Sequence, residues 1–276
     1  MNKRITNGLA IAILWLAAGM TVATLGALLL YVFVNGVGVV LQGFPSFIFT
    51  SPHGVNSEGG IWPTIVATVY VTALAMLIST PISVLAAVYL AEYAHQGRVV
   101  DTIRFAADSL ASVPSIVMGL FGFALFVEAM GLGLSMISAA LALSLLMLPI
   151  IMRATEEAIR SVPKYMRWGS YGLGATKWQT VRKIVLPAAA PRIITGIVLA
   201  MGRAVGETAV VLYTMGQAVH VPVSPLDQGR PMTVHLYLLA VDGINLPTAF
   251  GTALLLIVMI LGFNLSARLI LRLRKV

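Results

Sequence analysis

This chain of 276 residues contains no cysteine and few charged residues. The missing cysteine excludes disulfide frameworks, thiol chemistry and cysteine-ligated metal sites. Asp, Glu, Lys and Arg together make up only 10% of the residues, whereas 59% are hydrophobic. The mean hydropathy is +0.94. Such a composition excludes an ordinary soluble domain and indicates an integral membrane protein.

Acidic residues are the scarcer charged class, with 10 Asp and Glu against 18 Lys and Arg. A net charge of +8 is compatible with nucleic acid or with anionic lipid as a partner. The basic residues do not cluster on a soluble domain, however, but lie between long apolar runs. We therefore expect membrane lipids, and no nucleic acid, to be in contact with this chain.

Six apolar runs are each close to the length of about 20 residues that a membrane-spanning helix needs. They are Leu9–Val34, Trp62–Ala86, Leu110–Met130, Leu134–Met152, Ile193–Met215 and Thr248–Leu269. The first run is too long for a cleaved signal peptide, so we expect it to be retained. Backbone groups in lipid must be satisfied internally, which favours helices. The predicted fold is an all-α membrane protein with six spans in a single domain, residues 1–276.

The distribution of basic residues predicts the orientation of these spans. If the N-terminus is cytoplasmic, all Lys and Arg residues except Arg203 and Arg230 lie in cytoplasmic segments. This bias predicts that both termini are cytoplasmic and that the chain crosses a bacterial or archaeal plasma membrane several times.

Arg203 and Glu207 interrupt the fifth apolar run, and Thr208 follows them. A charge at the bilayer centre costs about 2.5–3.5 kcal/mol on insertion scales, so intramembrane charges usually have a function. The spacing of four residues predicts that both side chains share one helix face. We expect the three residues to belong to a translocation pathway or gate. The alternative is an interhelical ion pair that only fixes packing.

Smaller patterns accompany this pair. Gly202 and Gly206 form a GxxxG motif, which predicts a close helix contact either with a partner or within this subunit. Thr64, Thr68 and Thr72 share one face of the second span and either line a hydrated path or bond to their own backbone.

Polar residues also mark the start of the third span. Ser115 is a further candidate for lining a path. Arg104 and Asp108 are spaced as an i, i+4 pair, which predicts an ion pair at the membrane interface or an inner gate.

The longest predicted cytoplasmic segment runs over residues 153–192. Pro163, Gly172 and Gly174 divide it into short helices, and its aromatic residues indicate that it folds and docks a partner. The run from Gly169 to Thr176 looks like a phosphate-binding loop, but Ala175 replaces the essential lysine. A nucleotide is therefore expected on another chain, and the four histidines have no metal-ligand spacing.

The same segment resembles the cytoplasmic signature of bacterial ABC importer permeases. Gly174 is followed, after nine residues, by Ile184-Val185-Leu186-Pro187. The positions of the Glu-Ala-Ala start are occupied by Trp168, Gly169 and Ser170, so the family's glutamate is absent. The resemblance implies that this loop forms a coupling helix seated in a groove of an ATPase subunit.

Three other segments resemble the phosphate-specific members of that family, in particular the PstA-type subunit. They are Gly59–Thr64, Val113–Gly122 and Arg203–Ala209, and the resemblance extends to the basic C-terminus. It implies the type I ABC importer permease fold and a phosphate-importing complex. The implied partners are a homologous PstC-type permease, two ATPase subunits that bind ATP and Mg, and an extracytoplasmic phosphate-binding protein.

The resemblance further implies alternating access driven by ATP, with no catalytic residue, cofactor or metal in this chain. Other interpretations remain open. The cargo could be another oxyanion, such as sulfate, molybdate or phosphonate, or the chain could be an anion transporter or channel that does not use ATP.

Overall fold

The computed structural model describes residues 3–53, 58–241 and 243–273, and these residues are almost entirely helical. The exception is a small hairpin of two antiparallel two-residue strands, β1 (Pro52–His53) and β2 (Glu58–Gly59). The predicted all-α class is confirmed. The helices are α1 (Lys3–Gly43), α2 (Ser46–Phe49), α3 (Trp62–Val88), α4 (Arg98–Ser112), α5 (Ser115–Gly122), α6 (Met136–Arg160), α7 (Lys164–Gly172), α8 (Lys177–Thr180), α9 (Leu186–Gly206), α10 (Ala209–Thr214), α11 (Met232–Val241) and α12 (Leu246–Leu273).

Three π-helical segments extend these helices. They are η1 (Tyr89–Tyr93) after α3, η2 (Phe123–Ala129) after α5 and η3 (Val181–Val185) between α8 and α9. Among the described residues, five helices are long and apolar enough to cross a membrane, and the bent pair formed by α4 and α5 with η2 brings the number to six. The predicted number of spans therefore holds only if the bent pair counts as one.

Two predicted spans are not single helices over the expected residues. The third was expected as one helix over 110–130, but α4 and α5 meet at 100° because Pro114 disfavours a helical conformation at Val113. The fifth was expected to run over 193–215, but α9 begins earlier and ends at Gly206. In addition, α6 and α9 extend into the segment 153–192, so its irregular part is shorter than expected.

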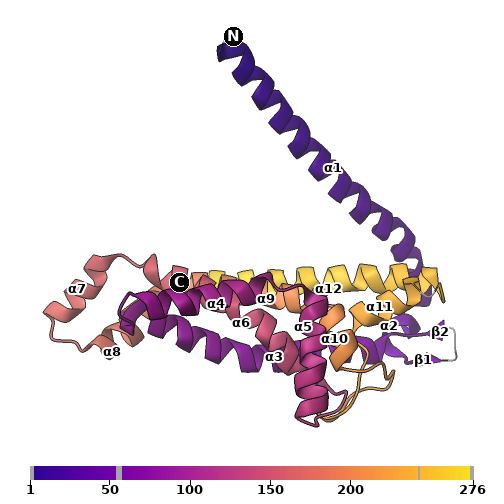
Figure 1. Ribbon diagram of the computed structural model, residues 1–276. Helices are drawn as coiled ribbons and strands as arrows, with labels where there is room; N and C mark the ends of the chain where they lie inside the picture. Colours follow the sequence, from indigo (N-terminus) through magenta and orange to yellow (C-terminus); the bar gives the residue numbers. More distant parts are fainter. Residues whose placement is uncertain (1–2, 54–57, 242, 274–276) are drawn as a thin grey trace.

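The long helices α3, α6, α9 and α12 lie along the long axis of the molecule, as Figure 1 shows. We call the end that carries α7 and α8 the loop end, and the end that carries α2, β1 and β2 the hairpin end. The core between α3 and α6 contains small side chains such as Ala75 and Ala139, which let the helices approach, and large ones such as Leu143 and Met147.

Helix α1 leaves this bundle (Figure 1). It contacts α12 near the hairpin end, where Gly36 lies against Phe250 and Leu254. The rest of α1 points away, and its apolar side chains, such as Trp15 at 75% exposure, have no cover within the described chain. Lipid or another apolar partner must cover this surface.

His235 is the one histidine of the described core, on α11, which is not among the candidate spans. Its side chain is fully buried, and neither ring nitrogen has a hydrogen-bond partner among the described residues. Burial, together with the positive charge of Arg230, lowers the pKa of His235 to about 4. The imidazole is therefore neutral in the folded protein at ordinary pH.

This burial predicts a pH-dependent stability. The unfolded chain takes up a proton at an ordinary pKa of about 6.5, whereas the folded chain resists protonation down to about pH 4. The contribution is thus complete above about pH 7 and decreases as the pH falls, by roughly 3 kcal/mol in total. Thermal unfolding in detergent at several pH values should show that His235→Phe lacks this part of the decline. The exposed His220→Phe is the control, and equal pH slopes in the two variants would contradict the prediction.

Candidate functional site

The candidate site lies at a break in α9. The helix ends at Gly206, Glu207 adopts an extended backbone with φ −72° and ψ 126°, and α10 starts at Ala209. Glycine at the end of α9 lowers the cost of stopping the helix there. The Thr233 hydroxyl, on α11, donates to the carbonyl oxygen of Glu207 at 2.9 Å. A neighbouring element thus satisfies a backbone group that the break would leave without a partner.

The prediction that Arg203 and Glu207 share one face of a continuous helix is wrong, because the helix ends between them. Their side chains nevertheless meet, with 3.5 Å between Nε of Arg203 and Oε1 of Glu207. Arg203 is 47% exposed and Glu207 only 10%. In contrast to a bidentate pair, this single contact leaves about half of the Arg203 side chain exposed.

Helix α5 brings a further polar group to the break. Its first residue, Ser115, is partly buried, and the Ser115 hydroxyl lies beside the Glu207 carboxylate. Thr208 is also partly buried, immediately before α10. The fold therefore brings together four of the predicted site residues, although Ser115 lies far from the others in sequence. Their role in a pathway or gate stays a prediction.

Two glycines allow α5 to reach this position. A Cβ atom on Gly119 would lie 2.9 Å from the carbonyl oxygen of Ala209 in α10. One on Gly122 would lie 2.7 Å from the Cβ atom of Ala142 in α6. Both distances are shorter than ordinary contacts, so a larger residue would push α5 away from the break.

The GxxxG motif has no packing partner within the described chain. No atom lies within 4 Å of a Cβ built on Gly202 or on Gly206, outside their own helix. The expected small-residue contact within this subunit is therefore absent from the part of the chain that the structure describes. A contact with a partner helix stays a prediction.

The three threonines of α3 are buried in the subunit core. Their exposed fractions are 0%, 2% and 4% for Thr64, Thr68 and Thr72. Thr64 and Thr68 donate to backbone carbonyls of their own helix region, at 2.7 Å each, and Thr68 also accepts from the backbone of Met232 at 2.8 Å. Thr64 and Thr68 therefore bond to the backbone, which is one of the two roles expected for these threonines. Lining of a path by the three side chains stays a prediction.

The loop end carries the residues of the family signature. Trp168 and Gly169 lie exposed on α7, and Ser170 is buried, with its hydroxyl 2.8 Å from that of Thr180. Gly174 has φ +78°, a left-handed conformation that glycine adopts without strain. The remaining signature residues are found where η3 passes into α9, with Ile184 and Leu186 partly buried and Pro187 exposed.

The corner between α7 and α8 exposes large apolar side chains. Tyr165, Trp168 and Trp178 are 69%, 67% and 52% exposed, and Leu173 is 91% exposed. Thr176 and Gln179 form a capping box at the start of α8, which satisfies backbone groups in the first turn of that helix. A preformed apolar surface of this kind is typical of a docking site for another protein.

The sequence did not indicate the ion pair between Glu92 and Arg167 that holds α7 to the bundle, which we call the Glu92–Arg167 clamp. Arg167 contacts Glu92 of η1, with 2.6 Å between Nη2 and Oε1, and both side chains are largely buried. Arg167 also donates to the carbonyl oxygens of Ile159 and Val162, at 2.9 and 2.7 Å. These two charges are 75 residues apart, so no local spacing could have indicated the pair.

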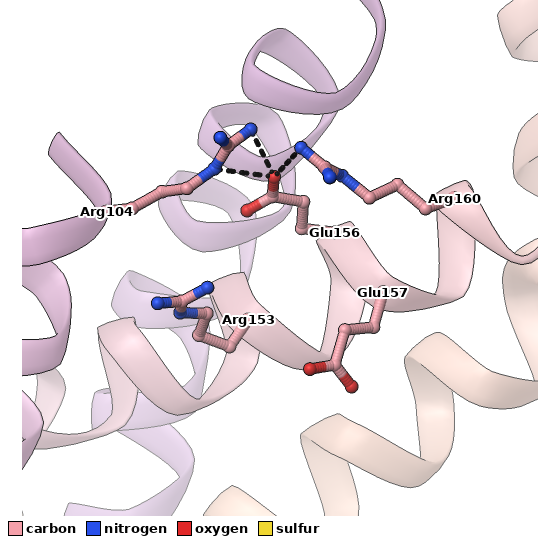
Figure 2. Close-up of a pocket in the computed structure, with 5 residues that line it drawn as sticks. All are labelled: Arg104, Arg153, Glu156, Glu157 and Arg160. Carbon is pink, nitrogen blue, oxygen red and sulfur yellow. Dashed lines mark hydrogen bonds and ion pairs between the residues drawn. The ribbon is translucent and has the colours of Figure 1, made fainter. Parts of the chain in front are cut away.

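The predicted pair of Arg104 with Asp108 is also wrong. Arg104 instead contacts Glu156 of α6, and Asp108 is paired with Arg153 of α6. Two ionic contacts therefore join α4 to α6 at the loop end. A hollow of about 250 Å³ lies beside these contacts. Figure 2 shows the five residues that line it, Arg104, Arg153, Glu156, Glu157 and Arg160.

Comparisons with known proteins agree with this architecture. A probable ABC transporter permease protein, YqgI of Bacillus subtilis, is 38% identical over 97% of this chain and 96% of its own length. The phosphate transport system permease protein PstA 1 of Mycobacterium tuberculosis is 34% identical over 98% of this chain and 90% of its own length. The PstA protein of Haemophilus influenzae is 33% identical over 86% of each chain.

Solved structures share the fold at lower identity. The MetNI methionine ABC transporter in inward-facing conformations matches with a TM-score of 0.60 and 22% identity, over 77% of this chain and 93% of that chain. A bacterial alginate ABC transporter in complex with an alginate-bound periplasmic protein matches with a TM-score of 0.63 and 17% identity, over 94% of both chains. The chain thus has the type I ABC importer permease fold.

A family model described as the binding-protein-dependent transport system inner membrane component matches residues 79–275. This range contains the break in α9, the α7–α8 corner and both ionic contacts between α4 and α6. With PstA proteins among its relatives at more than 30% identity over most of their length, the chain belongs to the binding-protein-dependent transport family of multi-pass membrane permeases.

Proposed function

We propose that this chain is the PstA-type permease subunit of an ATP-driven phosphate importer. The observation that carries the proposal is the half-exposed Arg203 guanidinium at a break in a membrane-spanning helix. Inorganic phosphate is an anion that cannot cross an apolar layer without compensation. Guanidinium is always protonated and matches phosphate geometry. The phosphate permeases among the relatives support the same cargo.

Glu207 has a definite task in this proposal. A bare cation in the pathway would hold phosphate tightly and slow its release. The nearby carboxylate weakens that attraction, and it also holds Arg203 in place through the 3.5 Å contact. Because only one nitrogen takes part, the guanidinium keeps other donors for a passing anion. Ser115 and Thr208 add hydroxyl groups beside the same break.

The exposed aromatic corner between α7 and α8 is proposed to dock the ATPase. Its apolar surface supplies the contact, and the Glu92–Arg167 clamp passes movement of the corner to α3 and α6. In the proposed complex, two ATPase subunits bind ATP and Mg on the cytoplasmic side. A homologous permease completes the pathway, and a phosphate-binding protein delivers phosphate from outside. Both termini of this chain would then be cytoplasmic.

The first test of this function is uptake of radiolabelled phosphate by vesicles that contain the co-purified complex. We expect uptake to require ATP and to resist competition by sulfate or molybdate. Uptake that favours another oxyanion would identify a different cargo. Uptake that persists with inactive ATPase subunits would point to an ATP-independent transporter or channel and overturn the proposal.

Arg203→Gln should lower phosphate uptake roughly ten-fold, because it removes about one charge-assisted hydrogen bond from the pathway. The complex should still assemble, since the guanidinium is half exposed and its only ion pair among the described residues is the 3.5 Å contact. Arg192→Gln is the matched control, an exposed arginine near the start of the same helix. Normal uptake by Arg203→Gln would remove this residue from the pathway.

Gly174→Val should uncouple ATP hydrolysis from uptake. Its φ of +78° disfavours any residue with a Cβ atom, and a β-branched residue most of all. The corner between α7 and α8 should then change shape while the bundle stays folded. The control is Gly172→Ala, which has an ordinary φ and open space around its Cβ position. ATPase stimulation and uptake should be measured together, and wild-type values for Gly174→Val would refute the role of this turn.

A further inference from the structure

Glu156 is a buried carboxylate at the loop end, with only 3% of its side chain exposed. Its Oε1 atom accepts from Nε of Arg104 at 3.0 Å and lies 2.7 Å from Nη2 of the same residue. Nη2 of Arg160 lies 2.8 Å from the same oxygen. Two arginines from different helices, α4 and α6, therefore meet on one oxygen atom, as Figure 2 shows.

The other oxygen of this carboxylate has no partner. Oε2 of Glu156 is buried and accepts no hydrogen bond from any described residue. A buried charged oxygen without a donor is costly, because water no longer solvates it. The arrangement therefore leaves one acceptor atom that a further donor could satisfy.

Arg153 is placed to be that donor. It lies one helical turn before Glu156 on α6 and lines the same hollow of about 250 Å³ (Figure 2). In this structure it turns to Asp108 of α4 instead, with Nε donating to Oδ1 at 2.7 Å and a second contact between Nη2 and Oδ2. The side chains of Arg153 and Asp108 are 38% and 51% exposed.

Arg153 therefore has two possible carboxylate partners, Asp108 and Glu156. The present arrangement makes a bidentate pair, but with an exposed carboxylate, and exposed pairs contribute little. The other would satisfy the buried oxygen of Glu156 and return Asp108 to water, which solvates it well. An element with two such arrangements can be shifted by a modest force from a partner.

Movement of α4 would reach the candidate site directly. The buried contact of α4 with its neighbours is small and contains Val100 and Ala107, whereas its larger apolar side chains, such as Phe105, point outward. Apart from this small apolar contact, α4 is joined to α6 by the contacts of Arg104 with Glu156 and of Asp108 with Arg153. Beyond the bend at Pro114, α5 begins with Ser115, which lies beside Glu207.

We propose that Arg153 is an exchangeable positioning residue that holds Asp108 in the state seen here. When α4 swings away from α6 and takes Arg104 with it, Arg153 moves to Oε2 of Glu156. This exchange would link the coupling loop to the position of Ser115 at the break in α9. The inference rests on the proposed function, because the driving movement is that of an ATPase docked at α7 and α8.

The test compares two substitutions that this exchange predicts to act in opposite directions. Asp108→Asn weakens the present pair and frees Arg153 for Glu156, so it should favour the swung state. Arg153→Gln removes a contact from both states. The contact with the buried oxygen of Glu156 is worth more than the exposed pair with Asp108, so this variant should favour the present state. The double variant should behave like Arg153→Gln, and Arg153→Lys should retain part of the wild-type response.

The readout is the distance between spin labels on α4 and beyond α6. Because this chain has no cysteine, Thr102→Cys and Ser161→Cys create its only labelling sites, and both positions are exposed. Distances should be measured in the full complex with cysteine-free partners, without nucleotide and with ATP trapped. We expect the wild type to change distance with ATP, Asp108→Asn to show the ATP-trapped distance already without nucleotide, and Arg153→Gln to keep the nucleotide-free distance in both conditions.

The proposal would be overturned if Asp108→Asn and Arg153→Gln changed the label distance identically, or if ATP did not change it in the wild type. The contacts would then only hold α4 to α6. The distance measurement needs no phosphate. If the label distance responds to ATP but the wild type does not take up phosphate, the exchange of Arg153 is supported and only the proposal of phosphate as cargo is contradicted.

Discussion

A charge inside an apolar layer must be paired or reach water. Arg203 does each in part, because it contacts Glu207 and remains about half exposed. Its helix stops within one turn, so that Glu207 leaves the helical path and still contacts the guanidinium. The break would cost unsatisfied backbone groups in lipid, and Thr233 from another helix supplies one of the missing hydrogen bonds. The close approach of α5 at Gly119 and Gly122 surrounds the same point. Three helices, α9, α11 and α5, therefore come together at the break beside this one arginine.

The loop end also has to accommodate charges away from water, and there they are buried in ion pairs. Here Glu92 and Glu156 are buried carboxylates, and each is neutralised by arginine from a distant helix. Removing one partner of such a pair is costly, whereas the pair itself adds little stability. These contacts therefore specify which helices adjoin more than they strengthen the fold. They join α7, η1, α4 and α6, the elements between the exposed aromatic corner and the break in α9.

Sequence patterns predicted the long helices well, because hydrophobic length is a local property. The second span was expected over Trp62–Ala86, and α3 covers Trp62–Val88. Prediction failed where one apolar run contains a bend. Val113 and Pro114 divide the expected third span, and Gly206 ends the helix of the fifth. Whether a helix continues at such a point depends on whether neighbouring elements can satisfy the freed backbone groups. The length of an apolar run does not indicate this.

The sequence by itself determined that this chain is a helical membrane protein of the binding-protein-dependent transport family, and it marked Arg203, Glu207 and the α7–α8 corner. The membrane class follows from composition and apolar length, and the family follows from the resemblance of short motifs to known permeases, all of which are local features. Only the tertiary structure decided that Arg104 pairs with Glu156 and Asp108 with Arg153. It also decided that Ser115 meets Glu207. The physical reason is that these partners lie 45 to 92 residues apart, and helix packing alone sets which charges become neighbours.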